Sequence, residues 1–316
     1  MLNLPMLALA LLAADGGTAA PSPATSTTEA PALPTGTDPP TTTTPKTTAP
    51  ETTAPATTAP ATTTTTTTEP ATNTLSLLSP TTMERRRPLV TDRPDLTESP
   101  ITVDAGHIQI ESDVVVATWR EQGGDATVAL DLMPTNVKIG LTNAVDLQLL
   151  VPALGIGWDA QGKATSFAGD LGMRLKWNLL GNDGGDVAVG VMPWFFVGGG
   201  DLRPGAGLIV PVGIALPGDF GLGTMAVINC VPVGDDAYDA EGILTATVSH
   251  AIVGDLAGYL EVAARGRPIT REGEVLASSG LTWLIGDSIQ LDAGLRLPVL
   301  TTDPRLETFV GVSARH

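Results

Sequence analysis

Acidic and basic side chains occupy alternate positions within several apolar segments of this chain. In 170–179, Asp170, Arg174 and Lys176 fall on one face of an extended chain, and leucine, methionine and tryptophan fall on the other. Successive side chains of a β-strand point to opposite faces, so the charged residues would share one surface. The predicted charged face comprises Glu111, Asp113, Lys138, Asp146, Asp170, Arg174, Lys176, Glu261, Asp292 and Arg296. Such a mixed set can form a selectivity constriction in a water-filled pore, or its opposite charges can neutralise one another in a closed one.

A second charged group lies in 85–100, where three consecutive arginines precede the sequence TDRPDLTESP. The prolines of this segment forbid a long helix, because proline lacks a backbone N–H and clashes with the preceding turn. Arg93, Asp95 and Glu98 are its candidate functional residues. Two placements fit the segment: a plug folded into a barrel lumen, or a lining of the barrel rim held by salt bridges.

Catalytic and cofactor chemistry have no comparable signature. Ser249 and His250 are adjacent, so a strand would point them to opposite faces, where they cannot act together as nucleophile and base. One cysteine and three histidines are too few for an internal disulfide or a clustered zinc site. A net charge of −17 argues against a surface that follows nucleic-acid phosphates. We therefore expect a non-enzyme with no cofactor, no metal and no nucleic-acid partner.

Composition divides the chain into four parts. Residues 2–14 form an apolar run followed by small residues, which is typical of a secretory signal peptide and too short to cross a membrane as a helix. The stretch that follows is dominated by threonine and proline and repeats TTAP, which predicts an extended, disordered linker. The predicted parts are a signal peptide at 1–20, the linker at 21–82, the rim or plug segment at 83–105 and a β-barrel at 106–316.

The alternating segments fit two all-β folds: a soluble sandwich with an apolar interior, and an antiparallel up-and-down transmembrane barrel with an apolar exterior. The secretory start and a predicted strict alternation of short turns with longer polar connections favour the membrane barrel. The longer connections are predicted at 121–125, 155–167, 198–205, 234–241, 265–273 and 301–305. About twelve strands are predicted, at 107–119, 126–141, 146–154, 168–180, 186–197, 206–216, 220–232, 242–252, 255–264, 274–285, 288–298 and 306–315.

An even number of strands returns both ends of a barrel to the same side of the membrane. We therefore expect the barrel in the outer membrane of a Gram-negative bacterium, with the linker and both mature termini in the periplasm. The expected partners are outer-membrane lipid, the barrel-assembly machinery and a small-molecule solute. Five tryptophans and two tyrosines are expected to contact lipid or anchor the barrel at the membrane interface, namely Trp119, Trp158, Trp177, Trp194, Trp283, Tyr238 and Tyr259.

The sequence TDRPDLTESPITVDAGHIQIE at 91–111 resembles the opening of outer-membrane transporter-like proteins of the family named for the meta-pathway of phenol degradation. In that family the element precedes a first strand that begins after glycine and carries Q-x-E, here Gly106, Gln109 and Glu111. The segments 138–152 and 169–180 resemble the family's second hairpin and fourth strand. The resemblance extends over about 88–316 and implies a channel or transporter without fixing its solute.

The sequence thus favours an outer-membrane channel or passive transporter for small solutes, with aromatic or hydrophobic compounds implied by the resemblance. No nucleotide-binding motif is present to couple transport to energy. Two alternatives stay open: a non-conducting structural or surface-displayed barrel, and a soluble secreted β-sandwich.

Overall fold

The computed structural model describes residues 75–198, 203–234, 237–300 and 304–316. The predicted signal peptide and most of the predicted linker lie outside these residues. Residues 75–82, which composition assigned to the linker, are described, and the backbone N–H of Leu77 donates to the carbonyl of Leu141 at 2.9 Å. This end of the range therefore contacts the folded chain.

The described residues form strands joined by turns, with one short 3-10 helix, η1 (Met83–Arg85). The strands are β1 (Ile108–Gln122), β2 (Asp125–Leu132), β3 (Thr135–Thr142), β4 (Val145–Val151), β5 (Leu154–Trp158), β6 (Ala164–Ala168), β7 (Leu171–Leu180), β8 (Val187–Val197), β9 (Pro204–Leu216), β10 (Phe220–Val233), β11 (Ala237–Val253), β12 (Leu256–Arg267), β13 (Glu272–Ile285), β14 (Ile289–Pro298) and β15 (Arg305–Arg315). Every pairing between them is antiparallel. No helix of the described ranges is long and apolar enough to span a membrane.

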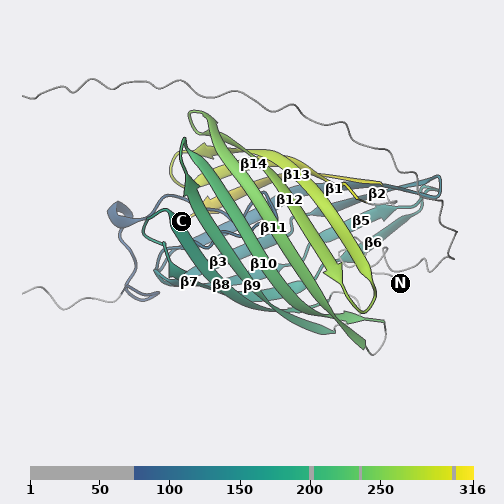
Figure 1. Ribbon diagram of the computed structural model, residues 1–316, viewed down its shortest axis with the longest axis horizontal. Coiled ribbons are helices and arrows are strands. Elements are labelled where there is room, and N and C mark those ends of the chain that lie inside the picture. The colour runs from purple at the N-terminus through teal and green to yellow at the C-terminus, as the bar shows by residue number, and fades with distance from the viewer. Residues whose placement is uncertain (1–74, 199–202, 235–236, 301–303) are drawn as a thin grey trace, which may run out of the picture. The chain divides into compact units, whose positions relative to one another are not determined.

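The sheet closes on itself because β15 pairs with β1 (Figure 1). Three strands of the barrel are interrupted and consist of two segments each: β2 continues into β3 across 133–134, β4 into β5 across 152–153, and β6 into β7 across 169–170. The two segments of an interrupted strand keep the same neighbours, since β3 pairs with β4 and β2 with β5. When each interrupted strand is counted once, the structure is the predicted closed twelve-stranded antiparallel barrel.

The prediction that long and short connections alternate strictly is wrong. The stretch 155–167, predicted as a long loop, contains parts of β5 and β6 joined by a short turn, and β1 passes to β2 through only Gly123 and Gly124. Figure 1 shows β2, β5 and β6 extended at the end of the barrel opposite the C-terminus. In β5 the apolar residues Leu154, Ile156 and Trp158 still alternate, with Gly155 and Gly157 between them, and polar residues follow at 159–166. These glycines and polar residues made the stretch resemble a loop.

Where one strand face is charged and the other apolar, the alternation does fix which face points outward. On β7, Leu175 and Trp177 are 40% and 53% exposed, whereas Lys176 between them is 1% exposed. Exposed large apolar side chains occur on all the barrel strands from β7 to β15, while many acidic and basic residues are buried. A continuous apolar exterior around a polar interior is the arrangement of a barrel surrounded by lipid, and it excludes the soluble sandwich.

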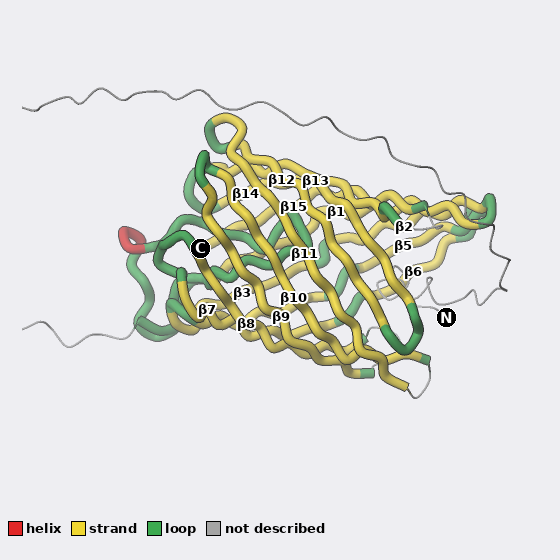
Figure 2. The backbone as a smooth tube through the Cα atoms, viewed as in Figure 1, coloured by secondary structure: helices red, strands yellow, loops and turns green. Residues whose placement is uncertain are grey.

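The segment 83–105, hereafter the plug segment, enters the barrel at the end where the C-terminus lies and runs into its interior. Figure 2 shows this non-strand chain within the ring of strands. Its backbone and side chains bond to β1, β3, β4, β7, β12 and β14 through the contacts described below. The interior is therefore filled in part by a segment that belongs to none of the strands.

Replacing Leu175 by arginine should destabilise membrane assembly by about 2–4 kcal/mol, the cost of a guanidinium on the lipid face near the bilayer midplane. The measurement is heat-modifiable electrophoretic migration together with denaturant titration in liposomes. Leu175→Met is the matched control and should assemble normally. Equal stability of the arginine and methionine variants would show that this face does not contact lipid.

Candidate functional site

The deepest contact of the plug segment joins Asp92 to two lysines of the barrel wall. Lys138 Nζ on β3 donates to Asp92 Oδ2 at 2.5 Å, and Lys176 Nζ on β7 donates to Oδ1 at 2.6 Å. Lys138 also pairs with Glu111 of β1, whose carboxylate accepts the backbone N–H of Asp92. Burial alone would raise the pKa of Asp92, but the adjacent ammonium groups hold it well below its ordinary value. This carboxylate therefore stays ionised while docked.

Arg93 bridges two carboxylates on β1 and β14, the strands on either side of β15. Its Nη2 lies 2.6 Å from Asp113 Oδ1 on β1 and 2.7 Å from Asp292 Oδ1 on β14, and its Nε donates to Asp292 Oδ2 at 3.2 Å. Gly311 of β15 makes room for the guanidinium, since a Cβ there would lie 2.1 Å from Nη2. Burial opposes the charge of Arg93, but the two carboxylates raise its pKa above the ordinary arginine value.

A third anchor uses a carboxylate of the wall and backbone groups of the plug segment. Glu261 on β12 accepts the backbone N–H groups of Leu96 and Thr97, both at 2.9 Å, and the Thr97 hydroxyl at 2.8 Å. Beside it, burial raises the pKa of Asp95 to about 7, and the charge of Glu261 adds to the rise. An acidic side chain that becomes ionised only as pH rises through about 7 thus lies next to one that holds the plug segment.

The fourth anchor is the ion pair between Glu98 of the plug segment and Arg174 of β7. The Arg174 guanidinium also lies over the ring of Trp194, 5.5 Å from its centroid. A similar arrangement within the wall pairs Arg296 of β14 with Glu307 of β15. In that second pair both partners belong to strands.

All ten residues of the predicted charged face lie on the inside of the barrel. Eight of them bond to the plug segment, namely Glu111, Asp113, Lys138, Asp146, Arg174, Lys176, Glu261 and Asp292. Asp146, for example, accepts the backbone N–H of Val103 at 2.9 Å. The remaining two, Asp170 and Arg296, line cavities beside the segment.

Two cavities flank the plug segment inside the barrel. One, of about 430 Å³, is lined by the plug segment and by polar residues of β1, β3 and β14. The other, of about 410 Å³, has an apolar wall of aromatic and aliphatic side chains from β8–β11 and a charged wall that includes Arg174 and Glu98. Hereafter we call the second the amphipathic cavity. Both cavities have the volume of small-molecule sites.

The apolar wall was not predicted from the sequence, and for Trp194 the prediction of a lipid or interface contact is wrong. Its indole Nε1 donates to Asn229 Oδ1 at 2.9 Å, and its ring stacks on Phe196 with centroids 4.5 Å apart. In β8 the inward side chains Met192, Trp194 and Phe196 alternate with the outward Pro193 and Phe195. Because both faces are apolar, periodicity gives no sign of which one turns inward.

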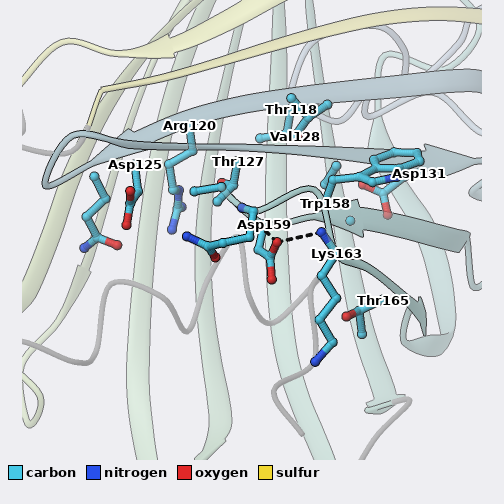
Figure 3. A pocket seen from close by; sticks show the side chains of 15 residues that line it. Thr118, Arg120, Asp125, Thr127, Val128, Asp131, Trp158, Asp159, Lys163 and Thr165 are labelled. Atoms are coloured by element: carbon cyan, nitrogen blue, oxygen red, sulfur yellow. Dashed lines mark hydrogen bonds between the residues drawn. The ribbon is translucent and has the colours of Figure 1, made fainter.

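A further cavity, of about 380 Å³, lies at the extended end of the barrel, away from the plug segment (Figure 3). It is bounded by β1, β2, β5 and the turn after β5, with Arg120 and Asp131 among its lining residues. In this turn Asp159 Oδ1 accepts the backbone N–H of Lys163 at 2.7 Å. Across the described parts of the chain, no cluster of three or more histidine, cysteine, aspartate or glutamate residues is placed to hold a metal ion.

No protein-family model matches the sequence, and no curated protein matches it. Solved structures with a similar fold are barrels of the outer membrane. The NanC porin is 11% identical, with 65% of this chain and 98% of that chain covered and a TM-score of 0.45. An outer-membrane channel from Pseudomonas putida F1 is 11% identical, with 72% of this chain and 100% of that chain covered and a TM-score of 0.46. The translocator domain of the autotransporter NalP from Neisseria meningitidis is 11% identical, with 66% of this chain and 88% of that chain covered and a TM-score of 0.40. The function of this chain is therefore argued from its own geometry.

The raised pKa of Asp95 predicts that docking of the plug segment weakens as pH rises. In the docked state its pKa is about 7, above the ordinary 3.8, so docking favours the protonated form. The stabilisation is complete below about pH 4 and is lost as pH rises through 7, where the ionised carboxylate repels Glu261. Hydrogen-exchange protection of the Leu96 and Thr97 amides should fall over this window in the native protein.

Asp95→Asn removes the titrating group and should make that protection less dependent on pH. Glu98 and Tyr259 also interact electrostatically with Asp95, so some pH dependence of the protection should remain in the variant. The variant is therefore compared with the native protein at each pH. Identical pH profiles for the two proteins would rule out Asp95 as the source of the effect.

Proposed function

We propose that this protein is an outer-membrane channel through which small solutes pass without energy coupling, and that the plug segment gates it. The observation that carries the proposal is that eight of the ten residues of the predicted charged face bond to the plug segment. A barrel built only for stability can satisfy such charges between neighbouring strands. This one satisfies them with a segment that is attached to the wall by non-covalent contacts and by its own chain ends.

The charges that hold the plug segment are also the groups that could line an open pore. Charges buried in protein need a partner, because leaving water costs several kcal/mol per ion. In an undocked barrel, water could replace the plug segment at the same side chains. Twelve strands place this barrel between filled eight-stranded forms and open sixteen-stranded porins, so a lumen occupied by a removable segment fits its size.

The orientation and the solute class belong to the same proposal. We place the C-terminus and η1 at the periplasmic end, so that the extended strands β2, β5 and β6 face outward. Residues 1–20 would direct export, the threonine- and proline-rich linker assigned to 21–82 would lie in the periplasm, and the barrel-assembly machinery would insert the chain. The resemblance of 91–111 to the meta-pathway of phenol degradation family supports small aromatic or hydrophobic compounds as solutes.

The experiment is conductance of the full-length protein in planar bilayers, with solute uptake by liposome swelling. Asp92→Ala should raise the open probability severalfold, because it leaves two buried lysines without the carboxylate that both of them contact. Asp183→Ala is the matched control, since Asp183 is 81% exposed and contacts Arg87 only at 3.6 Å. Its conductance should equal that of the native protein.

If heat-modifiable, folded protein gives neither conductance nor uptake in the native and the Asp92→Ala forms, the channel proposal fails. The non-conducting structural barrel would then replace it.

A further inference from the structure

We propose that the amphipathic cavity binds an organic carboxylate with a flat apolar body, and that the ligand's carboxylate takes the place of Glu98 on Arg174. The inference rests on the proposed function, which it deepens by naming a ligand class and the contact through which that ligand would loosen the plug segment. Three features of the cavity carry it: its apolar wall, its rigid aromatic pair and the incomplete Arg174–Glu98 ion pair.

The apolar wall is unusual for the interior of a polar barrel. Met192, Ile209, Met225 and Val227 form a buried cluster on neighbouring strands, and Trp194 packs against it. The partly exposed side chains of Trp194 and Ile243 pack on this cluster and line the cavity. Apolar surface that faces water costs about 25 cal/mol per Å², so this wall favours an apolar occupant. The cavity next to it measures about 410 Å³, within the range of small-ligand sites.

The aromatic pair is held flat against the wall by glycines of β9. A Cβ on Gly207 would lie 2.4 Å from Trp194 Nε1, and a Cβ on Gly205 would lie 2.0 Å from the ring of Phe196. The indole N–H is already bonded to Asn229, whose amide donates to Glu241 at 3.1 Å. The polar edge of the tryptophan is thus occupied, and apolar ring surface is what it offers to a ligand.

Arg174 connects this wall to the plug segment. Its guanidinium lies over Trp194 and pairs with Glu98, yet Nε of Arg174 and Oε2 of Glu98 are both buried without a partner. A guanidinium binds a carboxylate best through two parallel hydrogen bonds. Glu98 therefore satisfies Arg174 incompletely, and a free carboxylate able to approach in the bidentate geometry would satisfy it better.

Other arginines of the amphipathic cavity pair with glutamates of the wall. Arg296 pairs with Glu307, and Arg265 and Arg305 both pair with Glu274. Arg174 differs because its glutamate belongs to the plug segment. A ligand that exchanges with Glu98 would remove one anchor of that segment while its apolar body rests on Trp194 and Phe196.

The test is isothermal titration calorimetry at pH 8 on the full chain in detergent, with benzoate, benzamide and acetate as probes. Benzoate should bind more tightly than benzamide, which lacks the charge, and than acetate, which lacks the ring. Glu98→Gln should tighten benzoate binding by about tenfold, because it removes the charged internal competitor, and should leave benzamide binding unchanged. Arg174→Gln and Arg174→Lys should both weaken benzoate binding about tenfold or more, since neither side chain can make the bidentate contact.

Glu272→Gln is the matched control, because Glu272 pairs with Arg267 and does not line the cavity, and it should bind benzoate like the native protein. Heat-modifiable migration establishes that each variant is folded. The inference is overturned if Glu98→Gln leaves benzoate affinity unchanged or lowers it, or if benzoate binds neither the native protein nor this variant. Calorimetry needs no conduction, so either result would leave the channel proposal to the bilayer measurements.

Discussion

A charge inside this barrel must have a partner, and the structure depends on how that requirement is met. Lys138 and Lys176 are among the most buried side chains of the described chain, at 2% and 1% exposure. Two like charges cannot be buried side by side without a counter-ion, and Asp92 supplies it from outside the sheet. The docking of the plug segment between β3 and β7 follows from this contact.

The same requirement separates the two surfaces of the barrel. Outside, apolar side chains such as Leu175 and Trp177 are matched by lipid. Inside, some charges pair within the wall, as Arg296 does with Glu307, and others pair with the plug segment, which could exchange with water or with a ligand. Glu98 shows the difference most clearly, because it satisfies Arg174 only in part and borders a cavity with an apolar wall. A structure in which every interior contact was optimal would leave no such site.

The sequence predicted the barrel well where one strand face is charged and the other apolar. On β7 and β14 the alternation identifies the inward residues, Lys176 and Asp292 among them, without knowledge of their neighbours. It fails for β8, where Trp194 and Phe195 are both aromatic although they face opposite ways. It also fails at the extended end, where β5 and β6 replace a predicted loop, because the glycines of β5 and the polar residues after it resemble a loop.

The partners of the plug segment could not be read from the sequence at all. Arg93 and Asp292 are 199 positions apart, and only closure of the sheet brings them to 2.7 Å. The composition of 83–105 was compatible with both a rim and a plug, since charge and proline content fix neither path. The plug position is determined by the closed barrel, because its interior charges pair with side chains and backbone groups of 83–105.

The central claim is that the plug segment controls passage through the lumen, and a reversible tether tests it most directly. The hydroxyl oxygens of Thr97 in the plug segment and Thr245 on β11 lie 2.7 Å apart, so cysteines at both positions can be oxidised in a Cys230→Ser background. The account predicts that the oxidised protein stays closed in planar bilayers and that a reductant restores conductance to the level of the Cys230→Ser parent. Equal conductance before and after reduction, with the disulfide verified by mass spectrometry, would contradict it.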